Sequence, residues 1–380
     1  MKTTRTCLPF ELVAEILSWL PAKCLLKFMC VSKTWLRLLK TDSHFINLHL
    51  HHSIQANHSS ILLLRKHDDT EMIQYYHAEA ETENTSKAIE LELPLTSSSY
   101  YLVGIRNGLI CLTKKDYSDL CIWNPLTKEH ITIPCPPFIP SHFRSRIANL
   151  HFGFGFIQGT NEYKVIRIVS SCYDDINARK DYHSLVSVYT LGGIGSWRDL
   201  DDVSYYFGRP SAPLVNGSLH WLVFGETKMD WGYYNVIVSF DIKDEVFQEL
   251  PWPKGVNRFK ECTHKEIVEL GGVLWYVRCW YGKEAVAWVM KDYGVDGSWT
   301  KLYRVESPGI CGEFSWLKPL GVANSGEIVL AKDGRKLMMF NPQTNSITKL
   351  NEFGFQDADG CMGFRASCPL HLADVLSYYD

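Results

Sequence analysis

The sequence lacks any hydrophobic run long enough to cross a membrane. A membrane-spanning helix needs about 20 consecutive apolar residues, and no stretch of this chain comes near that length. The apolar run near the N-terminus is interrupted by Pro9, Glu11 and Glu15, so it does not have the pattern of a secretory signal peptide either. We therefore expect a protein of the cytoplasm or the nucleus, with no membrane partner.

Paired cysteines and an excess of one charge are also missing. The 12 cysteines are scattered singly, with no C-x-x-C pair. This pattern predicts reduced thiols, most of them small core residues, rather than a disulfide framework. The 39 basic residues nearly balance the 42 acidic residues, for a formal net charge of −3. This balance argues against a dedicated nucleic-acid-binding protein.

Motifs for catalysis and cofactor binding are absent from the sequence as well. No G-x-S-x-G, H-E-x-x-H or kinase set occurs, and the glycines at 153–159 and 192–195 lack the strand–turn–helix setting of a phosphate-binding loop. His49, His51 and His52 have no Cys or His partner at ligand spacing, so we expect them in a solvated linker. The sequence predicts no metal or other cofactor and no catalytic activity of its own.

The first 50 residues have helical periodicity. Apolar residues recur at helical spacing from Leu8 to Leu20, and Pro21 ends this helix and opens a second one. Ser32 and Asp42 are placed to cap a third helix and a short fourth helix. Helices this short cannot bury all of their apolar residues among themselves. Some of that surface must therefore meet either the rest of the chain or an external partner.

The same segment resembles an F-box of the plant type. The resemblance rests on the strings Leu8-Pro9-x-Glu11-Leu12, Leu20-Pro21-x-Lys23 and Val31-Ser32-Lys33-x-Trp35. It implies docking onto a Skp-type adaptor, which connects to the cullin and RING subunits of a ubiquitin ligase. On this resemblance, the residues that contact the adaptor or support the contact are Leu8, Pro9, Leu12, Ile16, Leu20, Pro21, Leu25 and Val31.

After residue 53 short alternating strands replace the helical pattern. A turn followed by an apolar strand recurs, with its second residue at positions 108, 162, 217, 272 and 326, so the steps are 54, 55, 55 and 54. Four strands in each unit are typical of a kelch-like propeller. We predict an α+β multidomain fold, in which a small all-α domain at 1–50 and a linker at 51–56 precede an all-β propeller at 57–380.

The predicted propeller has six blades, because a weaker sixth copy of the turn and strand fits near residue 57. An open row would leave the terminal blades exposed, so we expect a closed ring. The stretch from Leu370 to Leu376 would supply the closing strand. Five or seven blades are the alternatives.

The repeats resemble the plant F-box-associated domain over about residues 55–376. Its marks here are Asn107-Gly108-Leu109-Ile110-Cys111-Leu112, Gly153-Phe154-Gly155-Phe156, Gly217-Ser218-Leu219-His220-Trp221 and Trp288-Val289-Met290-Lys291-x-Tyr293-Gly294. Members near the S-locus pollen determinants and members that act on immune receptors share these marks. The resemblance therefore implies a domain that recognises a client protein, and it does not identify the client.

Strand parity predicts where a client would bind. If the strands of a blade are called a to d, the long b–c and d–a connections leave from one end of the ring and the tight turns lie at the other. Loops on a rigid scaffold commonly carry recognition, and Tyr, Trp and Arg are enriched among interface anchors. The candidate client-binding residues are Tyr173, Asp174, Arg179, Tyr205, Tyr206, Arg209, Trp231, Tyr233, Tyr234 and Trp280.

These features together predict the substrate-recognition subunit of a Skp–cullin–F-box ubiquitin ligase. Tethering a client beside the charged ubiquitin-conjugating enzyme raises the effective concentration of its lysines. One alternative is an adaptor-bound protein with a non-degradative role in assembly, or in self-incompatibility or defence recognition. A second is a propeller enzyme resembling galactose oxidase, against which the missing copper-ligand constellation counts.

Overall fold

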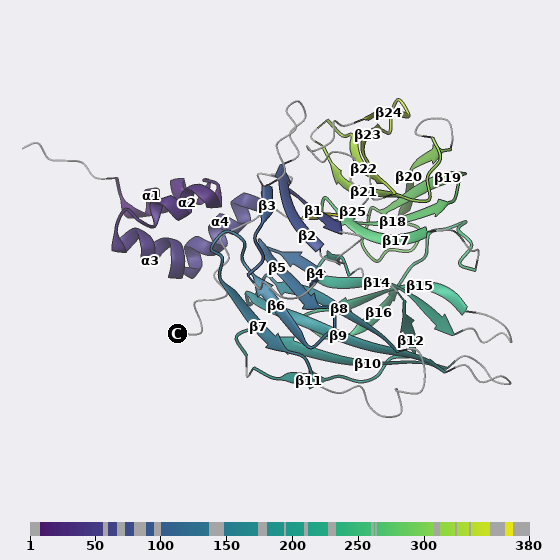
Figure 1. The fold of residues 1–380 in the computed structure, drawn as a ribbon, viewed down its shortest axis with the longest axis horizontal. Coiled ribbons are helices and arrows are strands. Elements are labelled where there is room, and N and C mark those ends of the chain that lie inside the picture. Colours follow the sequence, from purple (N-terminus) through teal and green to yellow (C-terminus); the bar gives the residue numbers. More distant parts are fainter. Residues whose placement is uncertain are drawn as a thin grey trace, which may run out of the picture.

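A computed structural model describes most of the chain. The residues that it describes are 8–55, 60–66, 73–79, 89–94, 100–136, 148–173, 181–193, 195–208, 212–226, 233–259, 262, 264–307, 312–323, 325–333, 336–349 and 362–367. Four helices come first and antiparallel sheets follow, as the sequence predicts (Figure 1).

The helices form a small N-terminal module, which packs around Leu17, Leu25 and Phe45. The helices are α1 (Phe10–Ser18), α2 (Ala22–Phe28), α3 (Lys33–Thr41) and α4 (Ser43–Gln55). Both predicted caps are present: the Ser32 side chain accepts a hydrogen bond from the Trp35 backbone N–H at 3.2 Å, and Asp42 Oδ1 accepts one from the Phe45 N–H at 3.0 Å. Each cap provides a partner for a backbone donor of the first helical turn.

The fourth helix is longer than predicted. It continues to Gln55, into the range expected to be linker, and it buries His49 and His52, whose exposed fractions are 1% and 7%. His49 Nε2 lies 3.0 Å from the Leu20 carbonyl oxygen, and His52 Nδ1 lies 2.8 Å from Ser18 Oγ. The prediction of solvated histidines was therefore wrong for these two, because their rings attach α4 to the end of α1.

The strands that the structure describes form six sheets. Within each sheet the strands are given in the order in which they pair. The first sheet is β25 (Met362–Ser367), β1 (Ser60–Lys66), β2 (Ile73–Glu79) and β3 (Ile89–Leu91), the second is β4 (Tyr100–Arg106), β5 (Leu109–Lys114), β6 (Asp119–Trp123) and β7 (His130–Pro134), and the third is β8 (Ala148–Ile157), β9 (Glu162–Tyr173), β10 (Asp181–Thr190) and β11 (Trp197–Asp199). The fourth is β12 (Tyr205–Phe207), β14 (Ser218–Glu226), β15 (Tyr233–Asp241) and β16 (Phe247–Leu250), with β13 (Leu214–Val215) also paired with β14, the fifth is β17 (His264–Leu270), β18 (Val273–Trp280), β19 (Glu284–Met290) and β20 (Trp299–Glu306), and the sixth is β21 (Leu317–Val322), β22 (Ile328–Lys332), β23 (Lys336–Asn341) and β24 (Ser346–Lys349).

The chain ends meet in one of these sheets. Strand β25 pairs with β1 in antiparallel register, so that Ser367 lies opposite Ser60. The stretch predicted to close the ring, Leu370 to Leu376, lies outside the described residues, and the pairing strand comes earlier in the chain. The side chains of β25, β1 and β2 are not among those that the structure describes, so how this sheet packs against its neighbours is not shown, and the count of six blades stays a prediction.

The repeated turns link the first and second strands of successive sheets. Asn107 and Gly108 have φ angles of 49° and 80°, and Asn216 and Gly217 have angles of 49° and 74°. Tight hairpin turns of this kind need two consecutive positive φ angles, which Asn and Gly tolerate best. The regular step of 54 or 55 residues is therefore the distance along the sequence between equivalent turns of successive sheets.

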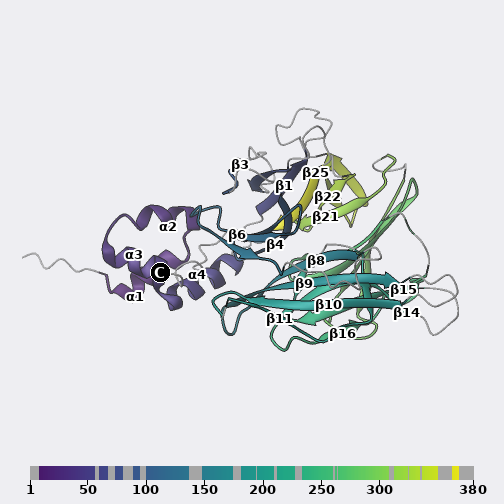
Figure 2. The same cartoon turned by 60° about the horizontal axis from the view of Figure 1, so that its bottom comes forward.

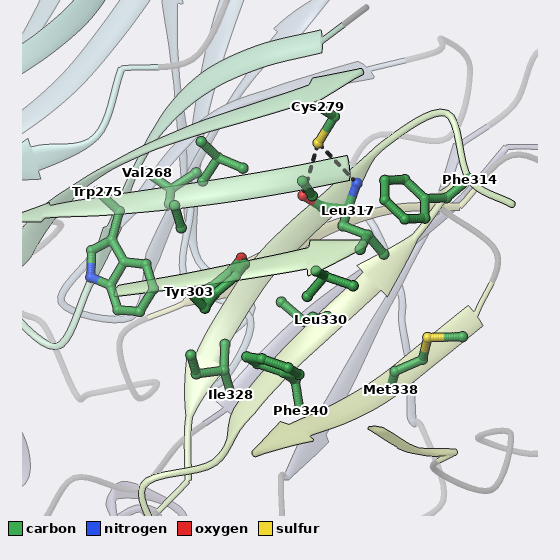
Figure 3. Close-up of a cluster of buried hydrophobic side chains, with 14 of the residues drawn as sticks. Val268, Trp275, Cys279, Tyr303, Phe314, Leu317, Ile328, Leu330, Met338 and Phe340 are labelled. Carbon is green, nitrogen blue, oxygen red and sulfur yellow. Dashed lines mark hydrogen bonds between the residues drawn. The ribbon is translucent and has the colours of Figure 1, made fainter. Parts of the chain in front are cut away.

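The space between neighbouring sheets is filled by large apolar side chains. Figure 3 shows one such core, where Trp275 and Tyr303 of the β17–β20 sheet pack against Leu317 and Phe340 of the next sheet. Cys279 Sγ lies 3.4 Å from the Leu317 backbone nitrogen. Burial raises the pKa of the Cys279 thiol to about 12, so it stays protonated and acts as a core residue.

Two glycines let β8 approach the adjacent sheet closely. A Cβ atom on Gly153 would lie 2.8 Å from Leu219 Cδ1 and 3.0 Å from Trp221 Cζ2, and one on Gly155 would lie 2.5 Å from Ile242 Cδ1. Real Cβ atoms do not come so near to other side chains, so β8 would have to move away. The sequence mark at 153–156 is thus a packing requirement between sheets.

Two tryptophans make the same hydrogen bond from one sheet to the preceding one. Trp197 Nε1 donates to the carbonyl oxygen of Pro134 at 2.9 Å, and Trp299 Nε1 donates to that of Pro251 at 2.6 Å. Each tryptophan begins the fourth strand of its sheet, and each proline ends or follows the fourth strand of the sheet before. We call these contacts the indole latches.

Replacing Trp299 by phenylalanine should lower the free energy of unfolding by about 1–2 kcal/mol, because the Pro251 carbonyl loses a partner in a mostly buried position. Trp197→Phe should have an effect of the same sign. Val246→Ala, at an exposed site between β15 and β16, serves as the control and should stay within about 0.5 kcal/mol of the parent chain. Urea unfolding measures all three, and a Trp299→Phe chain as stable as the parent would contradict a role for the latch.

Candidate functional site

Four apolar side chains of the helical module are exposed, and we call them the exposed apolar face. The exposed fractions are 62% for Leu8, 51% for Leu12, 55% for Ile16 and 60% for Val31. These side chains stay exposed although the rest of the chain is present. In the structure these four residues are therefore not covered by the propeller, which was one of the two alternatives. The other alternative is that an external partner covers them.

The other predicted adaptor residues have different environments. Pro9 and Pro21 are exposed and occupy the N-cap positions of α1 and α2, where the missing N–H of proline costs little. Leu20 is half-buried, and Leu25 is fully buried in the core of the module. Leu25 can therefore only support the contact from below. The prediction also missed three exposed apolar residues, which are Phe10, Trp19 and Leu36.

The helical module lies at the tight-turn end of the sheets. Lys40 Nζ on α3 lies 3.7 Å from a carboxylate oxygen of Glu129, in the turn between β6 and β7. Figures 1 and 2 both show the helices on one side of the sheets, with β14 and β15 reaching the far side. The long b–c and d–a connections leave from the other end of the strands, because successive strands in each sheet are antiparallel.

Four of the predicted client-binding side chains are described, and each is half-buried. Tyr205 Oη donates to Glu249 Oε1 at 2.9 Å, and Tyr206 Oη accepts from Asn149 Nδ2 at 2.7 Å. Burial, and then the Glu249 carboxylate, raise the pKa of Tyr205, so this hydroxyl remains a donor. Both rings thus pack between strands and expose only part of their surface to a client.

Tyr234 and Trp280 each lie beside an arginine. Arg258 lies over the Tyr234 ring at 5.8 Å, and Arg278 lies over the Trp280 ring at 4.4 Å. Of the remaining candidates, Asp174, Arg179, Arg209 and Trp231 lie outside the described residues, and the side chains of Tyr173 and Tyr233 are not described.

A pocket of about 520 Å³ lies beside Trp280. Its walls come from the segment after β16 and from one face of β18, β19 and β20, and the lining residues are Gly255, Val256, Asn257, Arg278, Trp280, Glu284, Val286, Trp288, Lys301 and Arg304. The sequence prediction found Trp280 here and missed the rest. Lys301 and Arg304 come from β20, a strand to which no client role was assigned.

Two of the sequence marks meet in a buried hydrogen bond. His220 Nδ1 lies 3.2 Å from the Pro213 carbonyl oxygen, and its Nε2 lies 2.8 Å from Tyr293 Oη. Burial lowers the pKa of His220 to about 4, so the ring is neutral and we infer that Nδ1 carries the proton. This histidine connects two sheets and has no access to a ligand, since its exposed fraction is 0%.

An ion pair joins two other neighbouring sheets. Lys318 on β21 pairs with Glu266 on β17, and His264 Nε2 lies 3.4 Å from the second Glu266 oxygen. Burial alone would raise the pKa of Glu266, but the Lys318 charge and the hydrogen bonds lower it well below its usual value. The carboxylate therefore stays ionised and holds the two strands together.

The described residues include neither a metal cluster nor a membrane-spanning helix. Among them, no three His, Cys, Asp or Glu side chains are grouped as metal ligands would be. Among the described helices, none combines the length and the apolar character that a bilayer crossing needs.

Comparison with known proteins adds to this geometry. Residues 6–47 match the F-box domain, and residues 59–371 match the F-box associated beta propeller domain. The chain is 30% identical to the F-box protein At3g07870 of Arabidopsis thaliana, over 90% of this chain and 87% of that protein. It is 27% identical to the F-box protein CPR1 of Arabidopsis thaliana, over 90% of this chain and 84% of that protein. The chain belongs to the plant F-box proteins that carry an F-box-associated β-propeller domain.

Proposed function

We propose that this protein recognises a client protein for a Skp–cullin–F-box ubiquitin ligase and is itself not catalytic. The observation that carries the proposal is the separation of two surfaces. The exposed apolar face lies on α1, just before it and in the turn after α2, whereas the long connections of the propeller leave from the end of the sheets that faces away from the module. One chain can therefore hold an adaptor and a client at once.

The adaptor side of the proposal concerns the exposed apolar face and the two exposed prolines. Leu8, Leu12, Ile16 and Val31 would contact a Skp-type adaptor, and cullin and RING subunits would join through it. The seven basic residues and three acidic residues of residues 1–52 give this module a charge of +4, which suits an acidic partner surface.

The client side concerns the long-connection end, with Tyr205, Tyr206, Tyr234 and Trp280 among its residues. We also propose that the ring has six blades and that β25 closes it, since β25 pairs with β1. A closed ring is rigid, and a rigid scaffold holds recognition loops in place. Because the ligase subunits act in the cytoplasm and the nucleus, the proposal places the protein there.

The half-life of bound proteins tests the receptor function. Proteins that the full-length chain captures in plant cells would be identified by proximity labelling, and their half-lives measured with the parent chain and with the Leu12→Asp/Ile16→Asp variant. The variant should keep its captured proteins and prolong their half-lives several-fold. Unchanged half-lives for every captured protein would refute the ligase role and favour a non-degradative one.

A further inference from the structure

The pocket beside Trp280 is built by the register of three neighbouring strands. Arg278 on β18 lies opposite Val286 on β19, and Val286 lies opposite Arg304 on β20. One pair further along β19, Trp288 lies opposite Lys301. Residues far apart in the sequence thus place three cationic side chains on one face of a sheet, beside a single lining carboxylate, that of Glu284.

Arg278 has the most unusual environment of these cations. Its exposed fraction is 3%, and its Nε and Nη2 atoms have no hydrogen-bond partner among the residues that the structure describes. Burying an arginine without partners is costly. The Trp280 ring at 4.4 Å compensates in part through a cation–π contact. A ring face accepts no conventional hydrogen bond, so the unpartnered N–H donors of Arg278 still need an acceptor.

The neighbouring charges leave a net positive pocket. Arg304 Nε pairs with Glu284, and it lies 3.3 Å from Glu306 Oε1 as well. Lys301 makes no ion pair with any described residue. The Glu284 carboxylate is therefore held by Arg304, and the charges of Arg278 and Lys301 are without a counterion in the described part of the chain.

The opposite wall of the pocket is held firmly. Trp252 Nε1 donates to the Val256 carbonyl oxygen at 2.9 Å, and Lys254 Nζ lies 3.2 Å from Asp296 Oδ2. Arg258 lies over both the Trp252 and Tyr234 rings, at 5.6 and 5.8 Å. These contacts tie the segment after β16 to the side chains around it, as is expected where the shape of a binding site is set before a ligand arrives.

We propose that this pocket binds an oxyanion, a carboxylate or a phosphate, carried by a peptide segment of the client. The inference rests on the proposed function, since it names the chemistry of a client contact. The donors of Arg278 match the paired oxygens of such a group, and Trp280 and Trp288 offer aromatic walls to the residue beside it. The β18–β19 connection, from Trp280 to Glu284, is short, but it joins the second and third strands of its sheet. It therefore lies at the same end as the long b–c and d–a connections, and the pocket lies at that end too.

Peptide pools with one fixed residue test the proposal. Dye-labelled hexapeptide pools would carry glutamate, phosphoserine, glutamine or serine at the central position, with the other positions mixed, and binding to the full-length chain would be measured by fluorescence polarisation. The glutamate or the phosphoserine pool should bind about 10-fold more tightly than its neutral counterpart. The two charged arms distinguish a carboxylate from a phosphate. Equal binding of charged and neutral pools would overturn the proposal.

Three variants locate the binding. Arg278→Gln should abolish the preference for the charged pools, while Lys243→Gln, a charge loss in an exposed turn of another sheet, should leave it intact. Should the buried substitution unfold the chain, Lys301→Gln at the exposed rim of the pocket takes its place and should weaken the charged pools about 3-fold. A full preference retained in Lys301→Gln, or in a folded Arg278→Gln, would refute the assignment to this pocket.

Inorganic phosphate serves as a further probe. If phosphate shifts the tryptophan fluorescence of the parent chain but no peptide pool binds, the pocket takes a free anion and the peptide proposal fails. The results of the peptide experiments can be distinguished from those of the half-life experiment that tests the receptor function. A chain that shortens client half-lives without an acidic preference refutes the pocket alone, and an acidic preference without any effect on half-lives refutes the receptor role alone.

Discussion

A Leu12→Asp/Ile16→Asp chain is expected to lose at least about 100-fold in affinity for a Skp-type adaptor. Both side chains are more than half exposed, at 51% and 55%, so neither substitution disturbs the core of the module. Central apolar residues of an interface cost about 2 kcal/mol or more each when they are lost, and a buried unpaired carboxylate adds to that cost. Because 1.4 kcal/mol is a factor of ten in affinity, the two substitutions together account for a loss of more than about 100-fold.

Biolayer interferometry with a purified adaptor would measure this change. The control variant is Glu11→Gln/Lys33→Gln, which alters two exposed polar residues of the same module and should keep the affinity within about 3-fold. The melting temperatures of all three chains should agree within a few degrees. Full affinity in the aspartate variant would show that the adaptor binds elsewhere on the chain.

A Trp221→Ala chain is expected to lose about 3–5 kcal/mol of unfolding free energy. The Trp221 side chain is 0% exposed, and its ring packs edge-on against Phe207 at 5.6 Å and near Phe247 at 6.3 Å. Deleting the ring leaves a cavity between the β8–β11 and β12–β16 sheets, and the rigid strands around it cannot fill the space. Urea unfolding, followed by circular dichroism, would measure the loss.

A double-mutant cycle connects this residue to Gly153. Gly153→Ala alone should cost about 1–3 kcal/mol, because the new Cβ would lie 3.0 Å from Trp221 Cζ2. In a Trp221→Phe background that ring carbon is absent, so the same alanine should cost less. Additive losses would instead mean that Leu219 Cδ1, at 2.8 Å, alone resists the methyl group.

Much of the fold could be predicted because its determinants are local. The caps at Ser32 and Asp42 and the turn at Asn107-Gly108 each depend on a few neighbouring residues, so a single sequence reveals them. The length of α4 could not be predicted in this way. Its second half is stabilised by His49 and His52 against the end of α1, and this tertiary contact leaves no periodic signal in the sequence.

The candidate sites also differ in whether local spacing or tertiary contacts determine them. The exposed apolar face follows from spacing along α1, although its prediction included Leu25, whose burial depends on the packing of α2 against α3 and α4. The pocket escaped prediction because Arg278 and Lys301 are neighbours only through the register of β18, β19 and β20. The one available signal was Trp280, an aromatic residue directly before a strand connection.

The position of the helices against the β6–β7 turn also bears on which lysines of a client can be modified. With about 3.3 Å per residue, strands of seven or eight residues such as β17 and β18 make the toroid about 25 Å thick. If adaptor and client occupy opposite poles, this thickness acts as a stiff spacer between the captured segment and the transfer machinery. Acceptor lysines close to the captured segment would then be out of reach, and those on long, pliable tails of the client would be favoured.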